Sequence, residues 1–121
     1  MTEASIPKDI RERTFSFALR VIKLCRHLDE KPGTSRVLGK QFLRSGTSIG
    51  ANVEEAQAGQ SKADFICKYA IALKEARETL YWIRLISAAQ LLPDNRLSDL
   101  QGEAGELAKI LGAIIVSAKR K

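Results

Sequence analysis

The sequence predicts an all-α fold, a single domain (1–121) built as an antiparallel up-down-up-down bundle of four helices. Apolar residues recur every three or four positions in four long stretches, and no strand-like alternation competes with this period. Turn-forming residues separate these stretches at 29–35, 58–61 and 91–95. The expected helices are 8–30, 35–57, 61–91 and 95–118.

The first helix, expected at 8–30, has an apolar face that is wider than half a turn. Its main stripe contains Ile10, Phe17, Val21, Leu24 and Leu28, and Phe15, Ala18, Ile22 and Cys25 extend it. Pro32-Gly33 then interrupts the pattern. Thr34 and Ser35 follow as candidate N-caps of the second helix.

The second helix, expected at 35–57, contains the unusual stretch LRSGTSIGANVEEA. A phosphate-binding loop would need a preceding strand and a Gly-Lys-Ser/Thr ending, and both are absent. The apolar register instead continues through the stretch on one face, made of Leu38, Phe42, Ile49, Val53 and Ala56. Gly39, Gly46 and Gly50 line up beside that face. We therefore expect a helix on which these glycines admit the close approach of a neighbouring helix.

The third helix, expected at 61–91 with Ser61 as its N-cap, carries two apolar stripes. The main one contains Phe65, Ile66, Tyr69, Leu73, Ala76, Leu80 and Ile83. The second lies on roughly the opposite side and contains Cys67, Ile71, Trp82, Leu85 and Ala89. A lone four-helix bundle has no neighbour for this second stripe. The pattern therefore predicts a subunit interface at Cys67, Ile71, Trp82 and Leu85.

The fourth helix, expected at 95–118, follows Pro93, which cannot continue the third. Its apolar stripe runs along one side and comprises Leu97, Leu100, Ala104, Leu107, Leu111, Ile114, Ile115 and Ala118. Glu103, Glu106 and Lys109 lie opposite, as in an ordinary surface helix.

Composition restricts the class of protein further. The chain has 20 Lys+Arg and 14 Asp+Glu, which gives a net charge of +6. No apolar run reaches the length of a membrane span, and the first residues lack the apolar core of a signal peptide. Cys25 and Cys67 are far from any CxxC spacing, so we expect both thiols to be buried and reduced. These features indicate a cytoplasmic protein without a membrane partner.

Acidic residues on the two central helices raise the question of a metal site. Glu54, Glu55, Glu75 and Glu78 would lie on adjacent helices. Di-metal bundles pair such glutamates with Glu-x-x-His motifs, but the one histidine, His27, has leucine at that offset. Because no nucleophile–base constellation occurs either, we expect neither enzymatic activity nor a cofactor nor a small-molecule substrate.

Ion pairs are the simpler expectation for these glutamates. Antiparallel pairing about residue 59 sets Lys40 level with Glu78 and Arg44 level with Glu75. Such pairs, within the bundle or across subunits, would mainly fix the helix register. Asn52, at the edge of the apolar face, would bond to backbone or to a neighbouring helix.

Two motifs resemble a known family. They are Ser48-Ile49-x-x-Asn52-Val53-x-Glu55-Ala56 and ALKEARETLYWIRLI at 72–86, which contains Glu75 and Glu78. Together they resemble the bacterial four helix bundle proteins, also called the ribosomal RNA intervening-sequence-encoded (S23-type) proteins, over roughly 8–118.

The family is similar in fold to the accessory variability determinant of diversity-generating retroelements, which works with a reverse transcriptase and its RNA. The resemblance implies a ring-shaped homopentamer without catalytic activity. It also implies an association with RNA, or with a ribosomal or reverse-transcriptase-like partner.

Two functions stay open from the sequence. The first is a non-catalytic homo-oligomeric scaffold that presents a basic surface to RNA or a nucleoprotein. The second is a protein-interaction module that binds no nucleic acid and whose charge only keeps it soluble. The candidate RNA contacts are Arg13, Arg20, Lys23, Lys119, Arg120 and Lys121. All seven aromatic residues fall on helices and most on packing faces, so contacts to phosphates are expected rather than base stacking.

Overall fold

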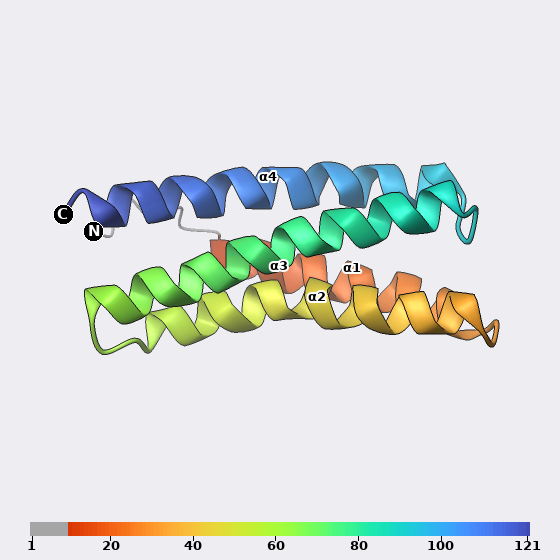
Figure 1. Ribbon diagram of the computed structural model, residues 1–121, viewed down its shortest axis with the longest axis horizontal. Coiled ribbons are helices and arrows are strands. Elements are labelled where there is room, and N and C mark those ends of the chain that lie inside the picture. The colour runs from red at the N-terminus through yellow and green to blue at the C-terminus, as the bar shows by residue number, and fades with distance from the viewer. Residues whose placement is uncertain (1–9) are drawn as a thin grey trace.

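The computed structural model describes residues 10–121, and these form four antiparallel α-helices. They are α1 (Ile10–Asp29), α2 (Thr34–Gln57), α3 (Lys62–Ala88) and α4 (Asp94–Lys119). Figure 1 shows the helices running back and forth along the long axis. The α1–α2 and α3–α4 connections share one end, and the α2–α3 connection and the C-terminus share the other. The predicted four-helix bundle is confirmed.

The helix boundaries differ from the prediction mainly at turns. Gly33, with φ 91°, is the N-cap of α2, and not Thr34 or Ser35. Only glycine adopts this backbone conformation without strain. The Ser35 hydroxyl instead donates a 2.7 Å hydrogen bond to the Leu28 carbonyl oxygen near the end of α1. Ser35 therefore ties the two helices together rather than capping its own.

The third helix ends three residues earlier than predicted. Gln90 adopts a left-handed conformation with φ 59°, and Pro93 then precedes α4 as its N-cap. At the other end of α3, Ser61 is the predicted N-cap, and its Oγ accepts a 3.0 Å bond from the Asp64 amide. The beginning of the first predicted helix, residues 8 and 9, lies outside the described residues.

The core is formed by one buried apolar stripe from each helix. On α4 it matches the predicted stripe except that Ile115 is only partly buried. On α3 the buried face is rotated from the predicted stripe toward α2, so small and polar side chains enter the core. The residues that define this face are Tyr69, Ala72, Ala76, Thr79, Ile83 and Ile86.

Among residues 10–121, four polar side chains are buried, and each has a hydrogen-bond partner. Thr14 bonds to the Ile10 carbonyl oxygen at 2.9 Å. Across the α2–α3 contact, Thr79 Oγ1 and Ser45 Oγ share a hydrogen bond of 2.9 Å. Both hydroxyls are completely buried, so this pair fixes the register of α2 against α3.

The four helices do not contact one another equally. α2 packs extensively on both α1 and α3, and α3 packs on α4, whereas α1 and α4 make the fewest contacts of the neighbouring pairs. Two polar contacts span this thin seam: Arg13 with Glu103 at 2.6 Å, and Arg96 with His27 at 3.1 Å. Within residues 10–121, each helix is too polar or too short to cross a bilayer.

Candidate functional site

Residues 10–121 contain no group of three or more His, Cys, Asp or Glu side chains placed to bind a metal ion. His27 is half exposed and contacts Arg96. The buried Cys25 thiol lies 3.4 Å from the Gly39 carbonyl oxygen, and burial raises its pKa to about 12, which makes it a poor nucleophile. Burial also raises the pKa of the Tyr69 hydroxyl, which accepts a bond from Gln57. These groups have structural roles.

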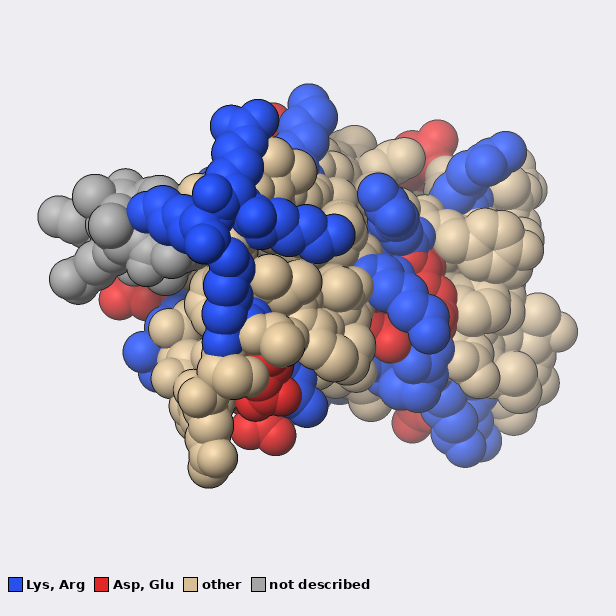
Figure 2. Space-filling model, turned by 60° about the vertical axis from the view of Figure 1, so that its left-hand side comes forward, with Lys and Arg blue, Asp and Glu red and all other residues tan. Residues whose placement is uncertain are grey.

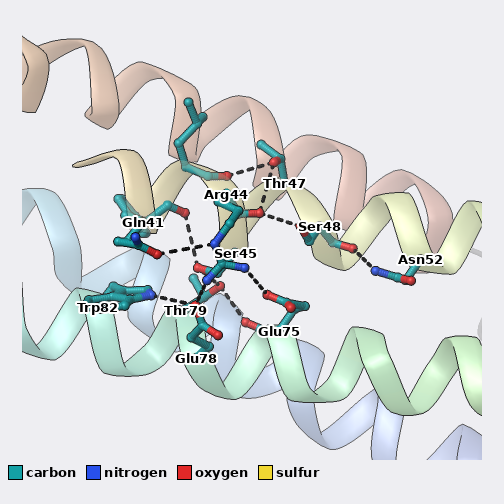
Figure 3. Close-up of polar contacts among 12 residues, drawn as sticks. Gln41, Arg44, Ser45, Thr47, Ser48, Asn52, Glu75, Glu78, Thr79 and Trp82 are labelled. Atoms are coloured by element: carbon teal, nitrogen blue, oxygen red, sulfur yellow. Dashed lines mark hydrogen bonds and ion pairs between the residues drawn. The ribbon is translucent and has the colours of Figure 1, made fainter. Parts of the chain in front are cut away.

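A polar cluster lies where α2 and α3 face each other (Figure 3). We refer to it as the Arg44 cluster, and it consists of Gln41, Arg44, Glu75, Glu78 and Trp82. Arg44 Nη1 lies 3.4 Å from Glu75 Oε2, and Arg44 Nη2 bonds to Glu78. Glu78 Oε2 also accepts a 3.0 Å hydrogen bond from Trp82 Nε1. One guanidinium therefore pairs with two carboxylates, which leaves an excess of one negative charge, and one of the carboxylates orients the indole.

The spacing of α3 explains the cluster. Residues 75, 78 and 82 are three and four apart, so their side chains leave the same side of the helix. The Glu75 and Glu78 side chains are only 12% and 27% exposed, which strengthens their interaction with the guanidinium. The sequence placed Lys40 opposite Glu78. In the structure Arg44 pairs with both glutamates. Its side chain is longer than that of Lys40, and it lies one helical turn closer to the two glutamates along α2.

The predicted interface residues extend along α3, and one of them, Trp82, belongs to this cluster. Cys67 is exposed, which contradicts the expectation that both thiols are buried, and it lines a shallow hollow together with Glu55 of α2. Ile71, Trp82 and Leu85 are partly buried within the single chain, and Trp82 packs in part on the core. The second stripe of α3 is thus half covered by its own bundle, and its outer edge stays open to solvent.

The largest exposed apolar side chains of the described chain include a pair on α1, of which Phe15 was expected to extend the apolar face. Phe15 is 66% exposed and Leu19, one turn later, is 48% exposed. Leu43 of α2 is 37% exposed and lines a groove of about 280 Å³ between α1 and α2, together with Ile22 and Cys25. This outer face of α1 and α2 is a second apolar surface, separate from the one on α3.

The three glycines singled out in α2 all face α1. A Cβ atom at Gly46 would lie 2.8 Å from a Val21 methyl group, one at Gly39 would lie 3.1 Å from Leu28 Cβ, and one at Gly50 would lie 3.3 Å from Thr14. The stretch 43–56 is continuous helix, as predicted, and the two helices meet there at close range.

The remaining family-motif residues have local partners or face solvent. The Asn52 side-chain amide donates a 2.9 Å hydrogen bond to the Ser48 carbonyl oxygen of its own helix (Figure 3). Glu55 is exposed and lines a shallow hollow with Cys67 and Lys68. Neither residue joins the Arg44 cluster.

The predicted basic residues fall into two groups. Arg13 is part-buried and forms a bidentate pair with Glu103, so its charge is already neutralised. Arg20, Lys23, Lys119, Arg120 and Lys121 are exposed. Figure 2 looks toward the end of the bundle that carries the C-terminus, and Lys and Arg side chains stand out from that surface, with Asp and Glu visible over smaller areas.

A further set of exposed residues was missed at the sequence level. Lys74, Arg77, Tyr81 and Arg84 are three or four residues apart along the outer face of α3, and we refer to them as the α3 basic stripe. Tyr81 is 54% exposed, which corrects the expectation that no aromatic ring is available for stacking. The helical spacing of three cations about one aromatic residue is the signal that could have revealed the stripe.

A solved structure and a protein-family model match this chain. No curated protein matches the chain. A protein of unknown function from the S23 ribosomal protein family of Bacteroides thetaiotaomicron has a similar crystal structure. It is 40% identical, with a TM-score of 0.83, and the match covers 88% of this chain and 97% of that one. The family model for the 23S rRNA-intervening sequence protein matches residues 8–113. The chain is therefore a member of the 23S rRNA-intervening sequence protein (S23-type) family.

Proposed function

We propose that this protein is a non-catalytic scaffold that assembles with copies of itself and presents a basic surface to RNA. The observation that carries the proposal is the surface of α3. On its α2 side a half-buried Trp82 is held in place by Glu78, and on its outer side stand Lys74, Arg77 and Arg84. A fixed, partly open aromatic group suits a protein contact, and exposed cations suit a polyanion.

Self-assembly is supported by the two apolar surfaces of the single chain. A closed ring of identical subunits uses two different surfaces of each subunit, one facing each neighbour. The outer edge of the α3 stripe and the Phe15–Leu19 surface of α1 could supply them, since both leave apolar area in water. We propose five subunits, on the family resemblance.

RNA as the partner is supported by charge and by membership of the family. Each chain carries +6, so a ring of five would carry roughly five times that charge, and repeated weak contacts then reinforce one another. The alternative is a protein-interaction module that binds no nucleic acid, as the clustered apolar surfaces alone would suggest.

Light scattering during size-exclusion chromatography tests the assembly. We expect a mass several times the 13.4 kDa of the chain at micromolar concentration. Trp82→Asp should lower the mass toward one chain, because a charge in the partly exposed stripe would be buried on assembly. Val37→Asp, at a site on α2 that is 60% exposed, is the matched control and should leave the mass unchanged.

Circular dichroism of both variants shows whether the helices persist, and Leu85→Asp repeats the test if Trp82→Asp fails to fold. A wild-type protein that elutes as a stable monomer would overturn the scaffold. Equal masses for wild-type protein and for folded Trp82→Asp and Leu85→Asp variants would move the interface away from this side of α3.

A further inference from the structure

We propose that the α3 basic stripe is a binding surface for single-stranded RNA, on which Tyr81 stacks with a base while Lys74, Arg77 and Arg84 contact phosphates. This inference rests on the RNA-binding half of the proposed function. It assigns the contact to α3, and not to the α1 residues and C-terminal tail that the sequence suggested.

The four side chains of the stripe share one face. They occupy positions 74, 77, 81 and 84, and all four residues are exposed. The rise of about 1.5 Å per residue spreads them over roughly 15 Å along the helix. That is long enough to follow several nucleotides of an extended strand, and the aromatic ring sits between the cations rather than at one end.

The glutamates of α3 and α4 are engaged away from the stripe, whereas Asp94 at the start of α4 accepts a hydrogen bond from Ser87, one turn beyond Arg84. Glu75 and Glu78 turn toward α2, where both pair with Arg44. On α4, Glu103 reaches across to α1 to pair with Arg13. Asp99 and Glu106 lie four residues before and three residues after Glu103, so they leave α4 on the same side. Glu78 is four residues after Lys74, but its carboxylate is held by Arg44 and Trp82, so the three cations of the stripe exceed the one nearby carboxylate of Asp94.

The neighbouring side of α4 leaves room for a ligand. Gly105 and Gly112 are two and nine residues beyond Glu103, which places both on the opposite side of α4 from the α1 contact. A Cβ atom at either glycine would meet nothing within 4 Å. The two glycines therefore leave this flank of α4 open at these two positions.

The Tyr81 ring packs against the neighbouring side chain of Trp82. It makes an edge contact with Trp82, with 5.2 Å between ring centroids and an interplanar angle of 70°. The indole of Trp82 is in turn held by its 3.0 Å bond to Glu78. A ring that is more than half exposed yet fixed by its neighbour loses little freedom when a base stacks on it, which favours binding.

Fluorescence anisotropy with a labelled 20-nucleotide single-stranded RNA tests the inference, titrated at several salt concentrations. We expect the double variant Arg77→Ala/Arg84→Ala to weaken binding at least tenfold at low salt. A plot of log affinity against log salt has a negative slope, and it should become less steep by about 1.4, since each lost phosphate contact contributes about 0.7. The matched control Arg20→Ala/Lys23→Ala removes the same charge from α1 and should change the affinity less than twofold.

Tyr81 separates stacking from simple charge attraction. Tyr81→Phe keeps the ring and should bind like the wild type, whereas Tyr81→Leu should weaken binding about tenfold. Light scattering and circular dichroism of each variant check that assembly and folding are unchanged, because Tyr81 adjoins Trp82.

The outcomes distinguish the two proposals. A wild-type protein that binds no RNA even at low salt overturns the RNA-binding function itself and favours the protein-interaction alternative. A wild-type protein that binds, but loses affinity in the α1 variant and keeps it in the α3 variant, overturns the assignment to α3 alone. Equal affinities for Tyr81→Phe and Tyr81→Leu, with displacement of RNA by polyglutamate, would reduce the stripe to an unspecific polyanion surface and overturn the stacking.

Discussion

At the scale of single residues, Gly46 controls how closely α1 and α2 approach. A Cβ atom there would lie 2.8 and 2.9 Å from the two methyl groups of Val21, closer than carbon atoms tolerate. Val21 is completely buried, and its branched side chain has few alternative rotamers, so it cannot move aside. The helix therefore carries glycine at this position although glycine disfavours helix.

Gly46→Ala should consequently destabilise the fold by about 1–3 kcal/mol, the usual cost of overpacking a core. Gly102→Ala is the matched control, since Gly102 is an exposed position of α4 with nothing within 4 Å. That change should stabilise the protein by about 0.5–1 kcal/mol. Urea unfolding followed by circular dichroism measures both. A shift of the same sign in the two variants would show that α1 does not lie against Gly46.

At the scale of helices, the Arg44 cluster joins α2 to α3 on the surface while Ser45 and Thr79 join them in the core. Arg44 and Ser45 are adjacent in sequence, so one turn of α2 supplies both contacts. The two layers fix the same register, and the outer one also sets the orientation of Trp82. The family-motif residues Glu75 and Glu78 thus contribute to the pairing of α2 with α3.

Arg44→Ala should lower the free energy of unfolding by about 1 kcal/mol, the low end of the cost of an unpaired group, because Arg44 itself is half exposed. Its loss leaves Glu75, with a side chain only 12% exposed, without its partner. Arg11→Ala removes the comparable pair with Glu54, where both side chains are 55% exposed, and should leave the unfolding midpoint unchanged. If the two variants behave alike in urea, the Arg44 cluster contributes no more than an ordinary surface ion pair.

At the scale of the whole molecule, the bundle is unevenly closed. α2 and α3 each pack extensively on two neighbours, whereas α1 and α4 barely contact each other. The exposed Phe15 and Leu19 also lie on α1. α1 and α4 therefore make fewer of the apolar contacts that resist local unfolding.

Native-state hydrogen exchange should show this gradient. We expect the central amides of α2 and α3 to exchange slowest and those of α4 to exchange first, because α4 depends mainly on α3 for its packing. Exchange at two protein concentrations adds a test of assembly, since subunit contacts on α1 and α3 would slow the amides of these two helices at the higher concentration. Equal protection of all four helices at low concentration would contradict the uneven packing.

The sequence by itself determined the helices, their order and the family. Apolar spacing in a helix fixes which residues share a face, and the stripe of α4 appears in the core as predicted apart from Ile115. Ser61 is predicted as an N-cap from the neighbouring residues alone, and the structure confirms this cap. The glycines of 43–56 also indicated a close contact, because nothing else compensates for three glycines in one helix.

Only the tertiary structure decided how these faces are used. Periodicity gives the angle of a residue about its own helix axis, but not the rotation of that helix against its neighbours. A small rotation of α3 toward α2 buried Thr79, left Cys67 in water and turned Tyr81 outward. Periodicity also does not predict how far a long side chain reaches along its helix. Arg44, rather than Lys40, therefore pairs with Glu78. The glutamates of α3 bind Arg44 on α2, a pairing that exists only once the helices are packed.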